Sequence, residues 1–306
     1  MDSTELRNYL DPKVLARISH LDLQARLVVE GFISGSHRSP FHGFSVEFAE
    51  HREYSPGDDI RHLDWKVLGR TDRLYIKQYE VETNLRCLFL VDISESMRYQ
   101  VAGRLSKFHY GACLASALAM LLLNQQDAVG LATFDSELRA NLACSSSPNQ
   151  IKSFVHELAG ATLGEKTDLE PMCRQLALSL PRRGLVCLVS DLLTEEESLF
   201  RALGHFRDRQ QEIMILHVMD QDELEFPFEG STRFEGLEQA GRLNVEPRAL
   251  RDGYLAALRE FCSSVQRRCA RERMDYRLVS TAERLDAALS AFLAARLAAL
   301  RKFRRK

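Results

Sequence analysis

The sequence has almost no excess of charge of either sign. Lysine and arginine number 41 and aspartate and glutamate 43, which leaves a formal net charge of -2 over 306 residues. A balance this close to zero does not favour binding to nucleic acid or to a membrane surface by bulk electrostatics. We therefore expect no nucleic-acid partner.

Paired cysteines are lacking as well. The seven cysteines are odd in number, scattered, and without a Cys-x-x-Cys pair. They are interpreted as reduced core residues of a cytoplasmic protein. The nine histidines show no His-x-x-x-His spacing, so a zinc site is not favoured.

No stretch of the chain has the pattern of a leader or a membrane span. The first residues show no basic patch that runs into an apolar stretch, so we expect no signal peptide. Residues 108–126 contain no charged side chain, but they include Ser116, Asn124 and Gln125 and lie between two predicted strands. We interpret them as a buried crossover helix.

Familiar catalytic motifs are absent or imperfect. The chain has no Gly-x-Ser-x-Gly elbow, the usual cue for a serine hydrolase. Residues 160–167 resemble a phosphate-binding loop, but Glu165 intervenes before the lysine and a helix precedes the loop. A haloacid-dehalogenase-like phosphatase needs a second acid where this chain has Ser94. These departures argue against all three classes.

What the sequence does contain is an uncharged apolar run that stops at a carboxylate. Residues 88–91 show no polar alternation, which is typical of a strand covered on both faces of a parallel sheet. Asp92, Ser94 and Ser96 follow at every second position. Their three oxygens can converge beyond the strand end, and hard oxygen ligands suit Mg²⁺, or Mn²⁺ in its place. A simple polar turn would have the same composition.

Two further oxygen ligands occur where a doubly wound fold would bring them alongside. Thr167 precedes a predicted helix, and Asp191 ends a predicted strand. Together with Asp92, Ser94 and Ser96 they resemble the metal-ion-dependent adhesion site of von Willebrand factor A domains. The resemblance implies that the hydroxyls ligate Mg²⁺ directly, while Asp92 and Asp191 hold it partly through water.

Strands and helices alternate from about residue 86 onwards, which predicts an α/β fold. We expect a doubly wound, mainly parallel six-stranded sheet, von Willebrand A-like, with strand order 3-2-1-4-5-6 and the metal at the switch point between the first and fourth strands. The expected domains are residues 1–84, an N-terminal helical extension, and residues 85–306. An irregular insertion with a small hairpin is expected at about 220–247.

The extension contains a segment in which acids, arginines and the single tryptophan are interleaved. One interpretation is a structural collar, a paired polar network covered by the tryptophan that holds the segment to the main domain. The other is a partner-docking surface, because arginine and tryptophan dominate binding hot spots. The residues of this collar are Arg52, Tyr54, Gly57, Asp58, Asp59, Arg61, Asp64 and Trp65.

The pattern Arg-x-Tyr-x-Pro-Gly-Asp-Asp-x-Arg-x-x-Asp-Trp upstream of Asp-x-Ser-x-Ser resembles the bacterial family catalogued as domain of unknown function fifty-eight. Its members are typically encoded beside MoxR-type AAA+ ATPases. The resemblance implies a metal-dependent adaptor that binds such an ATPase and a client protein, with a partner's acidic side chain completing the metal. The alternative is a Mg²⁺-dependent hydrolase or phosphatase, for which Glu95 or His109 is the nearest candidate base.

Overall fold

The computed structural model describes residues 8–10, 46–54, 64–71, 73–81, 85–164, 169–229, 232–235 and 242–304. The chain divides into two compact units. The larger comprises Met1–Gly35 and Leu85–Lys306, and the smaller comprises Ser36–Asn84.

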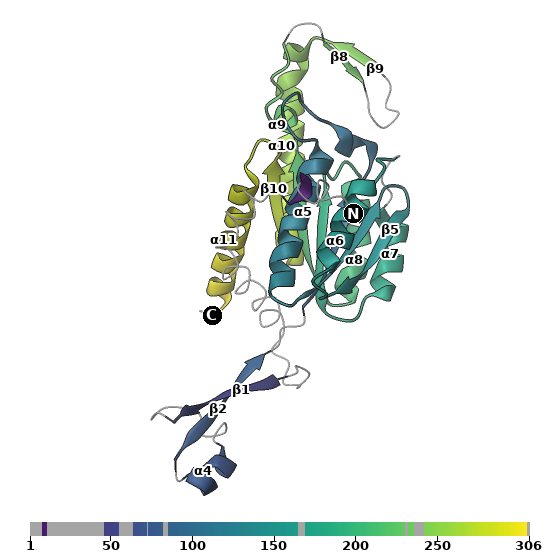
Figure 1. The fold of residues 1–306 in the computed structure, drawn as a ribbon. Coiled ribbons are helices and arrows are strands. Elements are labelled where there is room, and N and C mark those ends of the chain that lie inside the picture. The colour runs from purple at the N-terminus through teal and green to yellow at the C-terminus, as the bar shows by residue number, and fades with distance from the viewer. Residues whose placement is uncertain are drawn as a thin grey trace. The chain divides into compact units, whose positions relative to one another are not determined.

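A six-stranded sheet forms the centre of the larger unit (Figure 1). Its strands are β3 (Arg86–Asp92), β4 (Ala128–Phe134), β5 (Leu138–Ser145), β6 (Gly184–Ser190), β7 (Gln211–Met219) and β10 (Asp275–Ser280). They lie in the order β10-β7-β6-β3-β4-β5, and only the pairing of β5 with β4 is antiparallel. Numbered along the chain, this is the predicted order 3-2-1-4-5-6, so the expected fold class is confirmed.

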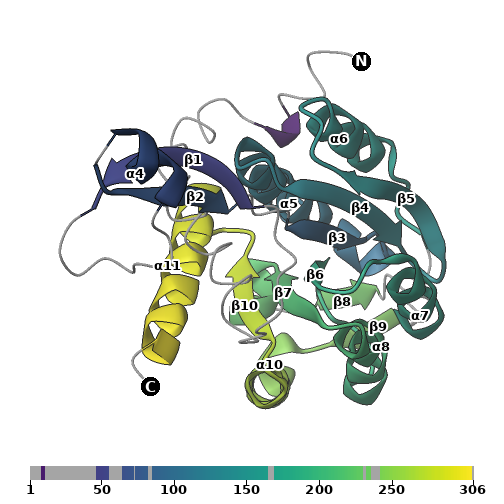
Figure 2. The same cartoon turned by 90° about the horizontal axis from the view of Figure 1, so that it is seen from below.

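Helices cover both faces of this sheet (Figure 2). Among the described residues from 85 onwards, the helices are α5 (Lys107–Asn124), α6 (Gln150–Gly160), α7 (Leu169–Ser179), α8 (Glu196–Asp208), α9 (Gln221–Glu225), α10 (Pro247–Glu272) and α11 (Leu285–Arg304), with a short 3-10 turn η3 (Glu95–Arg98). Helices α5, α6 and α11 pack on one face, and α7, α8 and α10 on the other.

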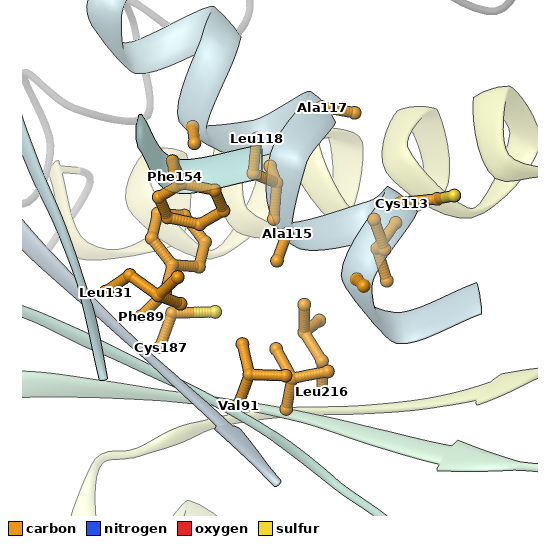
Figure 3. Close-up of a cluster of buried hydrophobic side chains, with 14 of the residues drawn as sticks. Phe89, Val91, Cys113, Ala115, Ala117, Leu118, Leu131, Phe154, Cys187 and Leu216 are labelled. Atoms are coloured by element: carbon orange, nitrogen blue, oxygen red, sulfur yellow. The ribbon is translucent and has the colours of Figure 1, made fainter. Parts of the chain in front are cut away.

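The side chains of β3 enter hydrophobic cores on both faces of the sheet. Successive side chains of a strand point to opposite faces, and here Phe89 and Val91 enter the core under α5, while Leu88 and Leu90 enter the core under α7 and α8. Figure 3 shows the first of these cores, with Phe89 against Phe154 of α6. The uncharged run therefore lies in the middle of the sheet, as its lack of polar alternation predicts.

The uncharged segment interpreted as a crossover helix is α5. Its residues are buried almost all round, because the sheet lies on one side and α6 and α11 on others. Tyr9 and Leu10, from the segment expected to form the extension, are buried in the same core. Within the described part of the chain, no helix has the length and apolar character needed to cross a membrane.

The expected insertion at about 220–247 contains α9 and a small hairpin. Strands β8 (Thr232–Glu235) and β9 (Arg242–Val245) pair antiparallel and form a separate two-stranded sheet. Helix α10 then begins at Pro247, whose fixed φ suits the first helical position.

The part of the smaller unit that the structure describes is an antiparallel hairpin with one helix. Strand β1 (Val46–Glu53) pairs with β2 (Tyr75–Val81), and α4 (Trp65–Thr71) lies between them in the chain. Asp64 is buried and accepts a hydrogen bond from the Val67 backbone N–H at 3.3 Å, which caps α4.

The collar residues are only partly within the described part of the chain. Gly57, Asp58, Asp59 and Arg61 lie outside it. The backbone of Arg52 pairs with Ile76 across the hairpin, and Tyr54 donates its backbone N–H to Leu74. Trp65 is 67% exposed, so its ring is not buried over a polar network.

Candidate metal centre

The carboxyl end of β3 brings three of the predicted ligands together. Asp92 is the last residue of the strand, and its Oδ1 accepts the backbone N–H of Ser94 at 2.8 Å. This bond turns the chain back on itself. The hydroxyls of Ser94 and Ser96 then lie 3.0 Å apart, and both residues are buried.

The adjacent strand β6 supplies the fourth residue and one that the sequence did not single out. Asp191 follows the last residue of β6, Ser190, whose hydroxyl donates to Asp92 Oδ2 at 2.5 Å. The same hydroxyl accepts the Leu192 N–H at 3.0 Å. Ser190 could have been suspected from its place directly before Asp191 at a strand end.

Two buried carboxylates therefore lie close together at the switch point between β3 and β6. Asp92 and Asp191 are each only 1% exposed. Burial, and then the charge of Asp191, raise the pKa of Asp92 to about 7, while hydrogen bonds from Ser190 and Ser94 oppose this rise. Such a pair is unfavourable when both members are ionised, and a cation between them would relieve the repulsion.

The side chain of a lysine already places a positive charge beside Asp191, and the sequence did not predict this contact. Lys107, the first residue of α5, is buried and its ammonium donates to Asp191 Oδ2 at 2.7 Å and to Glu223 Oε1 of α9 at 2.9 Å. Burial alone disfavours the charged amine, but the attraction of the two carboxylates outweighs it and raises the pKa of Lys107. Lys107 is therefore positively charged.

The backbone of Asp191 is held by a buried histidine. His217 Nε2 lies 2.9 Å from the Asp191 carbonyl, and His217 Nδ1 lies 2.7 Å from the Tyr276 hydroxyl. Because a carbonyl can only accept, Nε2 must carry the hydrogen and Nδ1 must accept from the tyrosine. Burial lowers the pKa of His217 to about 4, which agrees with this neutral form. The histidine thus ties the centre to β7 and β10.

The loop that leads to the fifth predicted ligand is described up to Gly164. Gly164 forms an isolated parallel bridge with Ser94 and donates its N–H to the Ile93 carbonyl at 2.8 Å. A side chain at this position would collide with the carboxylate of Asp135, because a Cβ would come within 2.0 Å of Asp135 Oδ2. Thr167 itself lies outside the described residues.

These residues fit a small hard cation. The buried oxygens of Asp92, Ser94, Ser96 and Asp191 are of the type that Mg²⁺ prefers, and the two carboxylates gain from a counter-charge. In the described ranges, no three His, Cys, Asp or Glu side chains gather in a way that could hold a metal ion. The candidate centre is of a different composition, because serine hydroxyls supply part of its oxygens.

The two candidate bases for a catalytic role have other partners. Glu95 forms an ion pair with Arg98, one turn along η3, at 3.4 Å. His109 stacks on the ring of Tyr9 with centroids 5.2 Å apart, and burial lowers the pKa of His109. Each is thus engaged in a structural contact.

A polar cleft of about 540 Å³ opens beside the centre. Asp135 and Arg139 line it on the β4–β5 side, with the Arg139 guanidinium 2.8 Å from Asp135 Oδ1. His156 and Glu157 of α6 line it on the other side. The cleft also reaches Ile93 and Gly164, so it borders the loop that carries the serines.

Comparison with known proteins gives one family and several distant likenesses. The model of the family described as protein of unknown function DUF58 matches residues 50–262. The chain is 25% identical over 254 residues to the uncharacterized protein Rv1480 of Mycobacterium tuberculosis, covering 81% of this chain and 78% of that protein.

Two solved structures are similar at low identity. They are BatB from Bacteroides thetaiotaomicron (17% identity, TM-score 0.46, 69% of this chain and 98% of that one) and the SpRpn10 VWA domain (13% identity, TM-score 0.36, 68% and 94%).

Proposed function

The chain belongs to the DUF58 family, and from this premise we propose that it is a metal-ion-dependent protein-binding module. The module holds Mg²⁺, or Mn²⁺ in its place, where β3 and β6 end. The observation that supports this most directly is the buried group of Asp92, Ser94, Ser96 and Asp191 at the switch point of the sheet. In open α/β sheets this is the point where ligands bind.

The five proposed metal residues are Asp92, Ser94, Ser96, Thr167 and Asp191. Three of them offer neutral hydroxyls, so an ion held here keeps most of its charge. Both oxygens of Asp92 already accept hydrogen bonds, from the Ser94 N–H and from the Ser190 hydroxyl. This favours a role for Asp92 partly through water. A partner that offers an acidic side chain would complete the coordination, and metal and partner would bind cooperatively.

The proposed partners are a MoxR-type AAA+ ATPase, as the family resemblance implies, and a client protein that the ATPase remodels or assembles. A reducing, cytoplasmic compartment is part of the proposal, because all seven cysteines are free thiols. The module has no catalytic role in this proposal, since Glu95 and His109 are engaged in structural contacts.

The test is a titration of a captured partner in Mg²⁺ and in chelator. Coupling of ~1–3 kcal/mol is usual between two sites, so saturating Mg²⁺ should tighten partner binding roughly tenfold to a hundredfold. Ser94→Asp should weaken the complex, because an internal carboxylate satisfies the ion and crowds the open position. Equal affinities with and without metal, or an undiminished Ser94→Asp complex, would contradict the proposal.

A Mg²⁺-dependent hydrolase or phosphatase is the second candidate. The observation that favours it is the polar cleft beside the centre, which would admit a small substrate next to Asp135 and Arg139. Multiple turnovers of a phosphoester that depend on Mg²⁺ and on Asp92 would support the enzyme. Stoichiometric capture of a partner without turnover supports the binding module.

A further inference from the structure

Lys107 occupies an unusual position for a lysine. Its side chain is 1% exposed, although it is the first residue of α5. The ammonium group lies between Asp191, which directly follows β6, and Glu223 on α9, at 2.7 and 2.9 Å, and 5.9 Å from the centre of the Tyr99 ring. A buried ammonium is stable only when such partners surround it.

The groups that face Lys107 differ in their relation to the candidate metal centre. Asp191 is one of the proposed metal residues, whereas Glu223 belongs to α9, where its Oε2 also accepts the Asp220 N–H at 2.9 Å. The Oδ1 of Asp191 accepts the Leu193 N–H at 3.3 Å. The carboxylate of Asp191 is thus satisfied within the protein, chiefly by an internal positive charge.

We propose that Lys107 is an internal counter-ion of the metal centre, which makes the free protein a weak metal binder. This inference rests on the proposed function and adds to it a residue that sets the affinity. The ammonium cancels one of the two carboxylate charges of the centre, Asp92 and Asp191, and it repels an arriving dication. Mg²⁺ must therefore share or take over Asp191 from Lys107.

The charges of Lys107 and Glu223 should change the Mg²⁺ affinity in opposite directions. Charges a few ångströms apart in a buried site interact strongly even at an effective dielectric constant of about 20. Removing the positive charge of Lys107 should tighten Mg²⁺ binding by roughly tenfold or more. Removing the negative charge of Glu223 should weaken it, because Asp191 is then the one carboxylate that pairs with Lys107 among the residues that the structure describes.

If Lys107 merely held Asp191 in position, removing it would change the Mg²⁺ affinity in the opposite direction. Loss of the lysine would then leave the Asp191 side chain less well oriented, and Mg²⁺ binding would weaken. The direction of the change on removing the lysine therefore separates a counter-ion from a positioning residue.

The experiment is a calorimetric titration of the full chain with MgCl₂ for the wild type and four variants. Lys107→Met removes the charge at similar length, Lys107→Arg retains it, and Glu223→Gln removes the neighbouring negative charge but keeps an oxygen for the Asp220 N–H. Arg104→Met is the matched control. Arg104 is a cation at the same edge that binds Asp220 and Asp222 at 3.2 and 3.0 Å, neither of them a proposed metal residue.

We expect tighter Mg²⁺ binding by Lys107→Met, weaker binding by Glu223→Gln, and values within about twofold of the wild type for Lys107→Arg and Arg104→Met. Measurable Mg²⁺ binding by Lys107→Met, when the wild type shows none, also supports the inference. If the wild type binds Mg²⁺ and Lys107→Met binds it equally or more weakly, the inference is wrong while the proposed function stands. If Lys107→Met does not fold, Glu223→Gln decides, and unchanged or tighter binding overturns the inference. If neither the wild type nor any variant binds Mg²⁺, the proposed function and the inference are both wrong.

Discussion

The hydroxyl of Ser190 donates to Asp92 Oδ2 at 2.5 Å and joins β3 to β6 beyond their last backbone pair, Val91 with Val189. The two residues are 98 positions apart in the chain. Because this side-chain bond holds the two strand ends together, Asp92 and Asp191 are kept at the same edge of the sheet. The candidate centre is therefore a product of strand pairing as well as of the loop after β3.

Asp92→Asn should abolish the stabilisation of the protein by Mg²⁺. The amide keeps an oxygen for the Ser94 N–H but removes the charge that a metal needs. A ligand at about 100 times its Kd stabilises the folded state by about 2.7 kcal/mol, and we expect this gain in the wild type but not in Asp92→Asn. Thermal unfolding with and without Mg²⁺ measures it. Asp222→Asn is the control and should retain the stabilisation by Mg²⁺. Asp222 is an acid that pairs with Arg104 and is not a proposed metal residue.

Gly164→Ala should destabilise the larger unit by about 1–3 kcal/mol, the usual cost of overpacking. The added Cβ would lie 2.0 Å from Asp135 Oδ2, and Asp135 cannot easily move because Arg139 and the Glu137 N–H hold it. Urea unfolding measures the change.

Gly160→Ala is the matched control for this variant. A Cβ at Gly160, the last residue of α6, would meet nothing within 4 Å. We expect it to be neutral or to stabilise by up to about 1 kcal/mol, because alanine favours helix more than glycine does. Equal effects of the two substitutions would contradict the close contact with Asp135.

Asp127→Asn should change how stability depends on pH. Asp127 is 0% exposed, its Oδ1 accepts the Leu85 N–H at 3.1 Å, and its Oδ2 has no hydrogen-bond partner within the described ranges. Burial raises the pKa of Asp127 from its usual value to about 7. The folded state thus binds this proton more tightly than the unfolded state, and wild-type stability falls as pH rises from about 4 to about 7.

The asparagine variant lacks this loss, so it should be more stable than the wild type at pH 8 by about 2 kcal/mol. A pKa rise to about 7 corresponds to about 4 kcal/mol at most, and an amide N–H without an acceptor cancels part of the gain. The difference should vanish near pH 4. Chemical unfolding at several pH values measures it, with the exposed Asp208→Asn as the control. A variant that is less stable at pH 8 would argue against a raised pKa.

Asp64→Ala and Trp65→Ala should affect the smaller unit differently, although they are neighbours. Asp64 is buried and caps α4 through Val67, so its loss should cost about 1 kcal/mol. Trp65 is 67% exposed, so its loss should change stability by no more than about 0.5 kcal/mol. Hydrogen exchange of the β1, β2 and α4 amides measures both. Loss of a partner by Trp65→Ala without loss of protection would favour the docking surface over the collar.

Much of the fold could be predicted because its signals are local. The uncharged run before Asp92 marks a strand covered on both faces, and the alternation of strands and helices implies the parallel sheet that the structure has. The segment free of charge between two strands is α5, bounded within two residues of its expected limits. The convergence of Asp92, Ser94 and Ser96 also follows from spacing, because these residues share one short loop.

The sequence by itself therefore determined the strands, the helices and the strand-end acids and hydroxyls, since periodicity and loop chemistry involve residues close in the chain. The strand order was expected from the resemblance to von Willebrand A domains. Only the tertiary structure decided what surrounds them. Lys107 reaches Asp191 across 84 positions, and Ser190 reaches Asp92 across 98. No local pattern encodes such pairs, because a lysine at a helix start or a serine at a strand end is ordinary in sequence. It acquires its role only when burial removes water and leaves a particular carboxylate as its partner.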